Sequence, residues 1–498
     1  MQEKDFMQLV KETNLLQATL ALLGWDTQTG MPEAASDYRI EQETFLSKLL
    51  FERLTGEEMQ GFLNYFKDHK DELSTLGQQT FEKVYEEYER MNVLPKEDYE
   101  AFNRSVSQAY QAWINARAQK DFGLFKDNLA QIIEFQRKFI PLWKKDEATN
   151  YDVLLNQYEP GMSVAILDGI FDQVRTGIMA IRKEIEEKGT KPDTSFLSRK
   201  VPKEMQVKFA RHLATQLGFD FSRGRLDDSV HPFMTGFNHN DTRLTSRWHE
   251  DDFQMGILGT LHEQGHGQFE QNVSPDFAYT PVGSSMSMGI HESQSLFQEI
   301  MIGSNLAFWK KEYPVFQEMT EGIFDDISLE TFFAGIKNSQ SSLIRVEADT
   351  LTYVLHIIIR YEVEKAIFND NVAVEDLPQL WNDKYEEYLG VRPSNDLEGI
   401  LQDIHWAGGS FGYFPSYALG YMYAAQMKHA MSKTLDFENL LEAGDYLPIK
   451  KWLDSNVRVY GASKKPKDVL FDATGENLNP EYLLKELKVL YELVYRIA

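Results

Sequence analysis

Residues 255–272 read MGILGTLHEQGHGQFEQN, and no other stretch constrains the fold and the chemistry as strongly. Leu258 and Leu261 belong to an apolar stripe at helical spacing, which predicts an amphipathic helix. His262 and His266 lie four positions apart, so both imidazoles leave the same face of that helix and can bind one metal ion. Two histidines at this spacing also occur on ordinary surface helices, so further signals are needed to identify a metal site.

Glu263 and three glycines supply such signals. Glu263 lies about 100° round the helix from His262, close enough to touch a water on the metal without binding the metal itself. Gly259, Gly265 and Gly267 each cost the helix roughly 0.8–1 kcal/mol relative to alanine. A helix that keeps three such residues is predicted to pack closely against a neighbouring backbone or a ligand.

A third ligand is available downstream, where the sequence HESQ beginning at His291 opens another helical stretch. Two histidines and a carboxylate, with one position left for water, are a common catalytic zinc arrangement. We therefore predict Glu292 as the third ligand, ahead of Glu270 and Glu299. The sequence alone leaves His291 open as an alternative, which would give a site of three histidines.

The composition of the 498-residue chain narrows the chemistry further. It has no cysteine, which excludes disulfides, thiolate nucleophiles and cysteine-bound metals, so His and carboxylates must hold any metal. Lys and Arg number 51 against 77 Asp and Glu, a net charge of −26 that argues against nucleic acid and anionic membranes as partners. The first residues lack the apolar core of a signal peptide, and no apolar run is long enough to span a bilayer, so we expect a cytoplasmic protein.

The remaining sequence predicts a mainly α-helical fold. Proline is sparse, and apolar residues recur at helical spacing, for example over 6–20, 40–50 and 81–88, where we expect each stripe to face the core. The pattern changes over about 219–248, where strand-like alternation predicts a small antiparallel sheet near the metal site. Helices resume at Phe253.

Six ordered blocks resemble those of the carboxypeptidase Taq family of metallocarboxypeptidases, known as peptidase family M32. The blocks are His231-Pro232-Phe233, Asp241 to Thr245 (DTRLT), His262 to His266 (HEQGH), His291 to Gln294 (HESQ), Ile344 to Asp349 (IRVEAD) and Gly399 to Trp406 (GILQDIHW). The resemblance implies a large helical fold with a deep active-site groove, similar to neurolysin and angiotensin-converting enzyme. It also implies a homodimer with a zinc or cobalt ion, acting on peptides with a free C-terminus and releasing single C-terminal residues with broad specificity.

The same resemblance implies one peptidase domain over residues 1–498. In this interpretation the helical region of about 1–200 covers the groove, and the region of about 201–498 carries the catalytic residues.

Peptide hydrolysis on such a site needs a general base and donors for the oxyanion. Glu263 is the predicted general base: it takes the proton of the attacking water and later delivers it to the leaving amine, which requires a carboxyl pKa raised by burial. His405 together with Tyr413 or Tyr417 are the candidate oxyanion donors. Their spacing does not choose between the two tyrosines.

An exopeptidase must also bind the free carboxylate of its substrate, for which the forked guanidinium of an arginine is suited. Arg345 is the first candidate because it begins an apolar helical stretch, where an unpaired arginine is costly. Arg243 is the second candidate, although either side chain could instead form a structural salt bridge. By family resemblance, His231 and Phe233 are expected to close one end of the groove.

Two other functions fit parts of the sequence. A dipeptidyl carboxypeptidase or an oligoendopeptidase could use the same fold, and an inactive helical scaffold could hold a structural metal. The intact Glu263 argues against the scaffold, because a purely structural metal site has no use for that carboxylate.

Overall fold

The stretch with the paired histidines forms helix α10 (Phe253–Asn272) in a computed structural model, which describes residues 1–497. The helix begins where predicted, because the side chain of Asp252 accepts a hydrogen bond from the backbone N–H of Met255 and so caps its first turn. Most of its residues are buried, so α10 is an internal element with neighbours on several sides.

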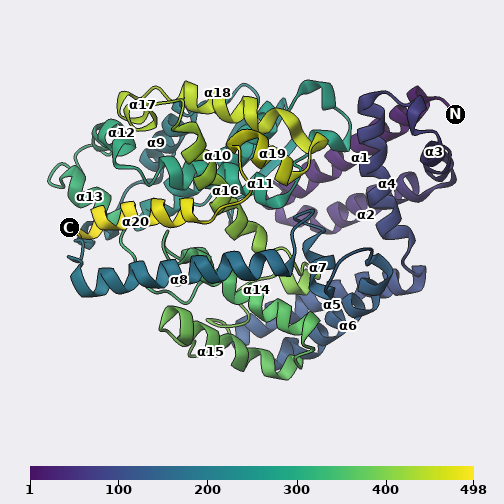
Figure 1. Ribbon diagram of the computed structural model, residues 1–498, viewed down its shortest axis with the longest axis horizontal. Helices are drawn as coiled ribbons and strands as arrows, with labels where there is room; N and C mark the ends of the chain where they lie inside the picture. The colour runs from purple at the N-terminus through teal and green to yellow at the C-terminus, as the bar shows by residue number, and fades with distance from the viewer. Residues whose placement is uncertain (498) are drawn as a thin grey trace.

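The chain is mainly helical, as the sequence predicted (Figure 1). Before the sheet come α1 (Glu3–Thr29), α2 (Ser36–Thr55), α3 (Glu57–Asp68), α4 (Thr75–Asn92), α5 (Lys96–Gln119), α6 (Gly123–Trp143), α7 (Asn150–Leu155), α8 (Val164–Lys188) and α9 (Lys203–Gln216). After α10 come α11 (Met288–Leu296), α12 (Leu306–Met319), α13 (Leu329–Ile336), α14 (Tyr353–Asn369), α15 (Leu377–Leu389), α16 (Pro415–Met431), α17 (Phe437–Ala443), α18 (Leu447–Asn456), α19 (Pro466–Thr474) and α20 (Glu481–Tyr495).

Figure 1 shows how these helices are arranged in space. The N-terminal helices α1 to α4 gather at one end of the molecule, and α20 runs out to the opposite end, where the C-terminus lies. The long helix α8 crosses the middle of the view, with α14 and α15 below it and α10, α11 and α16 above it. Most residues of α10, α11 and α16 are buried, so these helices lie inside the molecule.

The predicted sheet is present but is not wholly antiparallel. Its strands β1 (Gly224–Asp228), β2 (Met234–Asn238) and β3 (Asp241–Ser246) lie in the order β1-β3-β2, with β2–β3 antiparallel and β1–β3 parallel. Strands β1 and β2 do not pair as a hairpin, and the segment that connects them is bound to the end of β3. The backbone N–H and the hydroxyl of Thr245 both donate to the carbonyl oxygen of Phe233, and the N–H of Phe233 donates to the Thr245 hydroxyl. Strand β3 therefore occupies the middle and packs against α10.

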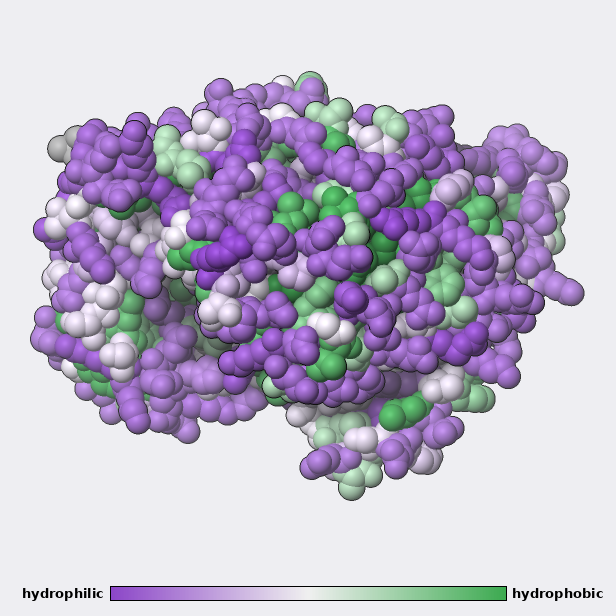
Figure 2. All heavy atoms as spheres, turned by 90° about the horizontal axis from the view of Figure 1, so that it is seen from below, coloured by the Kyte–Doolittle hydropathy of each residue, from purple (hydrophilic) through white to green (hydrophobic). Residues whose placement is uncertain are grey.

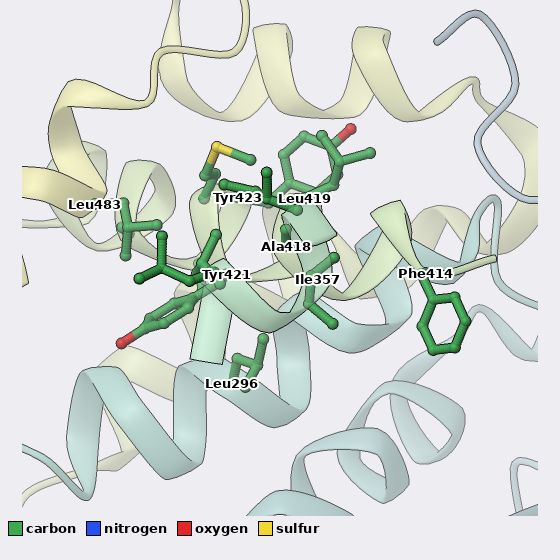
Figure 3. Packing of buried hydrophobic residues seen from close by; sticks show 14 of the residues in the cluster. Leu296, Ile357, Phe414, Ala418, Leu419, Tyr421, Tyr423 and Leu483 are labelled. Carbon is green, nitrogen blue, oxygen red and sulfur yellow. The ribbon is translucent and has the colours of Figure 1, made fainter. Parts of the chain in front are cut away.

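Helix α16 is at the centre of the helical core. Nearly all of its residues are buried, so it is enclosed on all sides and does not show one apolar stripe. Figure 3 shows its side chains Ala418, Leu419, Tyr421 and Tyr423 pointing in different directions. The same view places them among residues of α11, α14 and α20, so α16 connects the helices of the site to the rest of the core.

Two sequence expectations about helices were wrong in part. Helix α2 forms, but none of its residues is buried, and Ile40 and Phe45 are 60% and 63% exposed. Helix α2 packs chiefly against α1 at the end of the molecule, so its apolar stripe does not reach the core (Figure 1).

The second correction concerns the stretch after Ile344. Residues Arg345–Glu347 form only a 3₁₀ turn, and the helix α14 begins at Tyr353. Asp349 accounts for the delay, because its carboxylate accepts hydrogen bonds from the backbone and side chain of Thr352. Such local bonds favour a turn over a continuous helix.

No helix within residues 1–497 is both long enough and apolar enough to cross a membrane. Figure 2 shows one face of the molecule covered largely by hydrophilic residues, with hydrophobic side chains gathered in smaller groups near the middle.

The sequence predicted close packing at Gly259, Gly265 and Gly267 of α10, and the structure confirms it at the last two. A Cβ on Gly265 would clash with the backbone carbonyl of Gln294 on α11 and lie 2.6 Å from the Cα of Ser295. A Cβ on Gly267 would lie 2.7 Å from the ring of Phe219. Gly259 has no such neighbour, since its nearest contacts would be 3.8 and 3.9 Å away, and close packing does not explain this glycine.

These two environments give a matched pair of stability tests. Gly265→Ala should lower the free energy of unfolding by about 1–3 kcal/mol, because the backbone of α11 cannot yield without moving the whole helix. Gly259→Ala should raise it by roughly 0.5–1 kcal/mol, because alanine favours the helix and meets only ordinary contacts. Urea denaturation of both variants measures the difference, and equal effects would show that α10 and α11 can separate freely.

Candidate metal centre and active site

Helices α10 and α11 bring together His262, His266 and Glu292. Their ligand atoms all lie within 4.8 Å of one another, with Glu292 Oε2 at 3.2 Å from His266 Nε2 and 3.8 Å from His262 Nε2. Because both histidines sit on one face of α10, the close approach of α11 at Gly265 is what brings the carboxylate to them. The side chain of His262 keeps 23% of its surface exposed, so solvent reaches the cluster.

The second ring nitrogen of His262 is bound by another carboxylate. Its Nδ1 lies 2.8 Å from Glu299 Oε2, and since an ionised carboxylate only accepts, Nδ1 carries the proton and Nε2 is free to face Glu292. Glu299 lies in a π-helical turn, Phe297–Ile302, that follows α11. Such turns are frequent at functional sites.

The alternative ligands take other positions. His291 does not join the cluster: its ring stacks on that of His266 with centroids 4.5 Å apart, and its Nε2 lies 3.1 Å from Glu270 Oε1. Glu270 and Glu299 thus each contact a histidine nitrogen, and neither belongs to the group of converging ligand atoms.

The donor set and its charges fit a divalent cation. Two imidazole nitrogens and one carboxylate oxygen converge, which is the ligand type and number of a catalytic zinc site. Although burial acts in the opposite direction, the charges of Glu292 and Glu299 raise the pKa of His262 to about 10. Glu292 and Glu299 therefore favour a positive charge at this cluster, and a bound cation would supply one.

Glu263 is beside this cluster and is 8% exposed. Burial raises the pKa of its carboxyl to about 7, as the sequence argument required of a general base. A carboxyl with a pKa near neutrality can both accept and return a proton at physiological pH.

The aromatic segment before α16 and the first turn of that helix bring His405, Tyr413 and Tyr417 together. His405 Nε2 lies 3.3 Å from the hydroxyl of Tyr417, and the two tyrosine rings are 5.2 Å apart, centroid to centroid. Burial lowers the pKa of His405 to about 4, so its imidazole is neutral at pH 7. Burial also raises the pKa of both tyrosines above the ordinary value, which keeps their hydroxyls protonated.

Helix α16 places Tyr417 next to the metal cluster. Gly420 lies one turn further along the same face, and a Cβ on it would be 2.7 Å from Cγ of Glu292. The charge of Glu292 contributes to the raised pKa of both Tyr413 and Tyr417, as expected for neighbouring groups.

Arg345 shares a buried carboxylate with a second arginine. Its Nε and Nη2 donate to Asp403 Oδ1 at 3.0 and 2.8 Å, while Arg360 donates to Oδ2 at 2.7 Å. Although burial opposes it, the two guanidinium groups hold the pKa of Asp403 well below its usual range. Two cations and one anion leave one positive charge, and Arg345 lies over the ring of Tyr417 at 5.0 Å.

Arg243 has a different environment. Its Nε and Nη2 each donate to one oxygen of Asp241 at 2.9 Å, so one carboxylate balances its charge. The guanidinium also contacts the faces of Trp25 on α1 and Phe237 on β2, at 4.5 and 5.0 Å from the ring centroids. The structure thus shows Arg243 in an ion pair with Asp241, one of the partners that the sequence offered.

His231 and Phe233 lie in the connection between β1 and β2, which packs near α10. The side chain of His231 is exposed, and Phe233 is half-buried. A Cβ on Gly259 of α10 would be 3.8 Å from the intervening Pro232, which places the connection beside the metal-site helix. A role in closing the groove stays a prediction.

Sequence reasoning missed two contributors. Arg360 follows directly after the apolar run of α14, and a charge at the end of such a run is a signal that could have identified it. Tyr353 is half-buried near both clusters: desolvation raises its pKa above the ordinary value, with Arg345 opposing and Glu292 adding to the shift. No sequence pattern marks Tyr353, because its place depends on elements far apart in the chain.

Comparisons with known proteins agree over the whole chain. The sequence profile described as carboxypeptidase Taq (M32) metallopeptidase matches residues 5–491. Carboxypeptidase 1 of Bacillus subtilis is 46% identical over 99% of this chain and 98% of its own, and thermostable carboxypeptidase 1 of Thermus thermophilus is 34% identical over the same shares. The crystal structure of an M32 carboxypeptidase from Deinococcus radiodurans covers 99% of both chains with a TM-score of 0.95 at 30% identity.

The profile match, these identities and the shared fold agree with the site geometry: the chain belongs to the carboxypeptidase Taq (M32) metallopeptidase family and is a metallocarboxypeptidase.

Proposed function

We propose that this chain is a zinc-dependent carboxypeptidase that releases single C-terminal amino acids from peptides with broad specificity. The observation that carries the proposal is the convergence of His262, His266 and Glu292 beside a buried Glu263. These three side chains would hold the ion, with Zn²⁺ favoured by the donor set and Co²⁺ as the alternative that the family resemblance allows. The bound ion would supply a Lewis acid that activates water and polarises the scissile carbonyl.

Glu263 is proposed as the general base. Its carboxylate accepts the proton of the attacking water and passes it to the leaving amine, and the pKa near 7 suits both transfers. Tyr413 and Tyr417 are proposed as hydroxyl donors to the oxyanion, and the neutral His405 as the partner that orients Tyr417.

Arg345 is proposed to bind the C-terminal carboxylate of the substrate. The Arg345–Asp403–Arg360 group retains one unbalanced positive charge, whereas the Arg243–Asp241 pair retains none. A buried cation without a matching anion attracts a carboxylate strongly, because the surrounding dielectric is low. This contrast favours Arg345 over Arg243.

We further propose that residues 1–498 act as one peptidase domain in which the helices of about 1–200 cover the substrate groove, with His231 and Phe233 at its end. The family profile, which extends over residues 5–491, supports this organisation. A homodimer and a cytoplasmic location remain predictions from the sequence.

Digestion of one unblocked peptide tests the proposed activity. Mass spectrometry should show a ladder of products that differ by single C-terminal residues, and a chelator should abolish it until Zn²⁺ is restored. A C-terminally amidated peptide is the control and should be cut slowly. Release of dipeptides or internal fragments would instead identify a dipeptidyl carboxypeptidase or an oligoendopeptidase.

Substitution of the general base should separate metal binding from turnover. Glu263→Gln keeps the size and polarity of the side chain but cannot accept a proton, so kcat should fall by about 10²–10⁴-fold. The zinc content, measured by atomic emission, should stay near one ion per chain. A fully active variant would refute the role of Glu263.

Substitution of Arg345 tests carboxylate recognition. Loss of a charge-assisted hydrogen bond of about 1.5–3 kcal/mol should raise KM for free-carboxylate peptides by roughly 10- to 150-fold in Arg345→Ala, with little change for amidated peptides. Arg345→Lys retains the charge beside Asp403 but loses the fork, so its KM should be intermediate.

Arg243→Ala is the comparison, and it should not discriminate between the two peptides. Equal losses on both peptides in Arg345→Ala would make Arg345 structural, and a selective loss in Arg243→Ala would move the carboxylate site to Arg243.

A further inference from the structure

The N-terminus of α11 is bound by a loop from a distant part of the chain. All four of its first N–H groups have partners: those of Met288 and Gly289 donate to Tyr158 and Glu159, and the next two donate to Ser287. Helix ends leave these groups unpaired unless something outside the helix accepts from them. Two of the four acceptors therefore come from residues about 130 positions earlier.

Glu159 is built into this contact. It is 1% exposed, and its Oε1 accepts a hydrogen bond from the backbone N–H of Gly289. A Cβ on Gly289 would lie 2.5 Å from the same oxygen, so any larger residue would displace the carboxylate. The hydroxyl of Tyr423 on α16 lies 3.4 Å from Oε2. One carboxylate thus joins α11 to α16.

The loop that carries Glu159 is itself fixed. The N–H of Glu159 donates to Leu155 at the end of α7, and Asn156 Oδ1 accepts from Gly161 at 2.9 Å. Gly161 has φ +89°, a conformation that reverses the chain and that other residues rarely adopt. The carboxylate is therefore presented to α11 from a rigid support.

Helix α11 needs such a support because it has only nine residues, and helices this short are marginal without tertiary contacts. Glu292 lies one turn beyond Gly289, so a shift of the first turn moves the carboxylate of Glu292 directly.

We infer that Glu159 is a positioning residue for the metal site, which holds the first turn of α11 and thereby sets the distance of Glu292 from His262 and His266. The inference rests on the proposed function, in which Glu292 binds the ion. No atom of Glu159 needs to touch the ion or the substrate.

Zn²⁺ affinity of the full-length apoenzyme, measured by competition with a chromogenic chelator, tests this role. Glu159→Ala should weaken Zn²⁺ binding by about 10- to 100-fold, the range found when partners outside the ligand shell are removed. Glu159→Gln should stay within about threefold of the native chain, because its carbonyl oxygen can still accept from Gly289 and its amide can donate to Tyr423. Gly289→Ala breaks the same contact from α11 and should weaken binding even if Glu159→Ala folds poorly.

Glu312→Ala is the matched control. Glu312 is also a 1% exposed carboxylate, but it bonds Tyr446 and His212 away from α11. Its loss should lower the melting temperature and leave Zn²⁺ affinity unchanged, which separates positioning from general destabilisation.

The outcomes distinguish this inference from the proposed function. If Glu292→Ala loses Zn²⁺ binding while a folded Glu159→Ala binds within twofold of the native chain, the positioning role is overturned and the metal site stands. Equal weakening by alanine and glutamine at position 159 would also overturn it, since charge and not the accepted hydrogen bond would then matter. If Glu292→Ala binds Zn²⁺ normally, the proposed metal site itself fails.

Discussion

The close approach of α10 and α11 at Gly265 is the constraint on which the rest of the site depends. The histidines belong to one helix and the carboxylate to the other, so the distance between two backbones decides whether three ligand atoms converge. Gly420 of α16 allows a similar approach on the far side of Glu292. Helix α11 is thus held between α10 and α16, each of which has a glycine at its point of contact. Because packed interiors resist displacement, this confinement fixes the site geometry without bonds to Glu292 from many partners.

Helix α11 depends on its surroundings at both ends. Ser287 and Glu159 bind its first turn, and a π-helical turn follows its last residue and carries Glu299 to the Nδ1 of His262. Helix α11 therefore presents Glu292 and also leads directly to Glu299, the carboxylate that orients His262. A nine-residue helix with these connections behaves as a rigid linker between the histidine helix and the core around α16, and not as an autonomous element.

The parts of the site that sequence could predict are those governed by local spacing. The start of α10 and its two facing histidines agree with the geometry, because helical periodicity suffices to indicate them. Local spacing left His291 open beside Glu292, and it is the approach of α11 to α10 that brings Glu292 to the histidines. Local spacing could not predict contacts between elements that are far apart in the chain. The parallel β1–β3 pair, the exposed stripe of α2 and the sharing of Asp403 by Arg345 and Arg360 all depend on which distant element becomes a neighbour. Periodicity shows that a face is apolar, but it does not show what covers it.

A chain with a net charge of −26 should repel the negatively charged C-terminus of a peptide. Burial of a positive charge at the site can overcome this repulsion. Surface charges are screened within about 8 Å at physiological salt, so a net charge of −26 spread over the exterior acts weakly at a buried point. Within the core the dielectric is lower than in water, so the single positive charge left by Arg345, Arg360 and Asp403 acts more strongly on nearby groups than a surface charge would. The neutral His405 beside it adds no competing charge. In the proposed function, local burial of one cation therefore determines carboxylate recognition, and the overall charge of the chain has little influence on it.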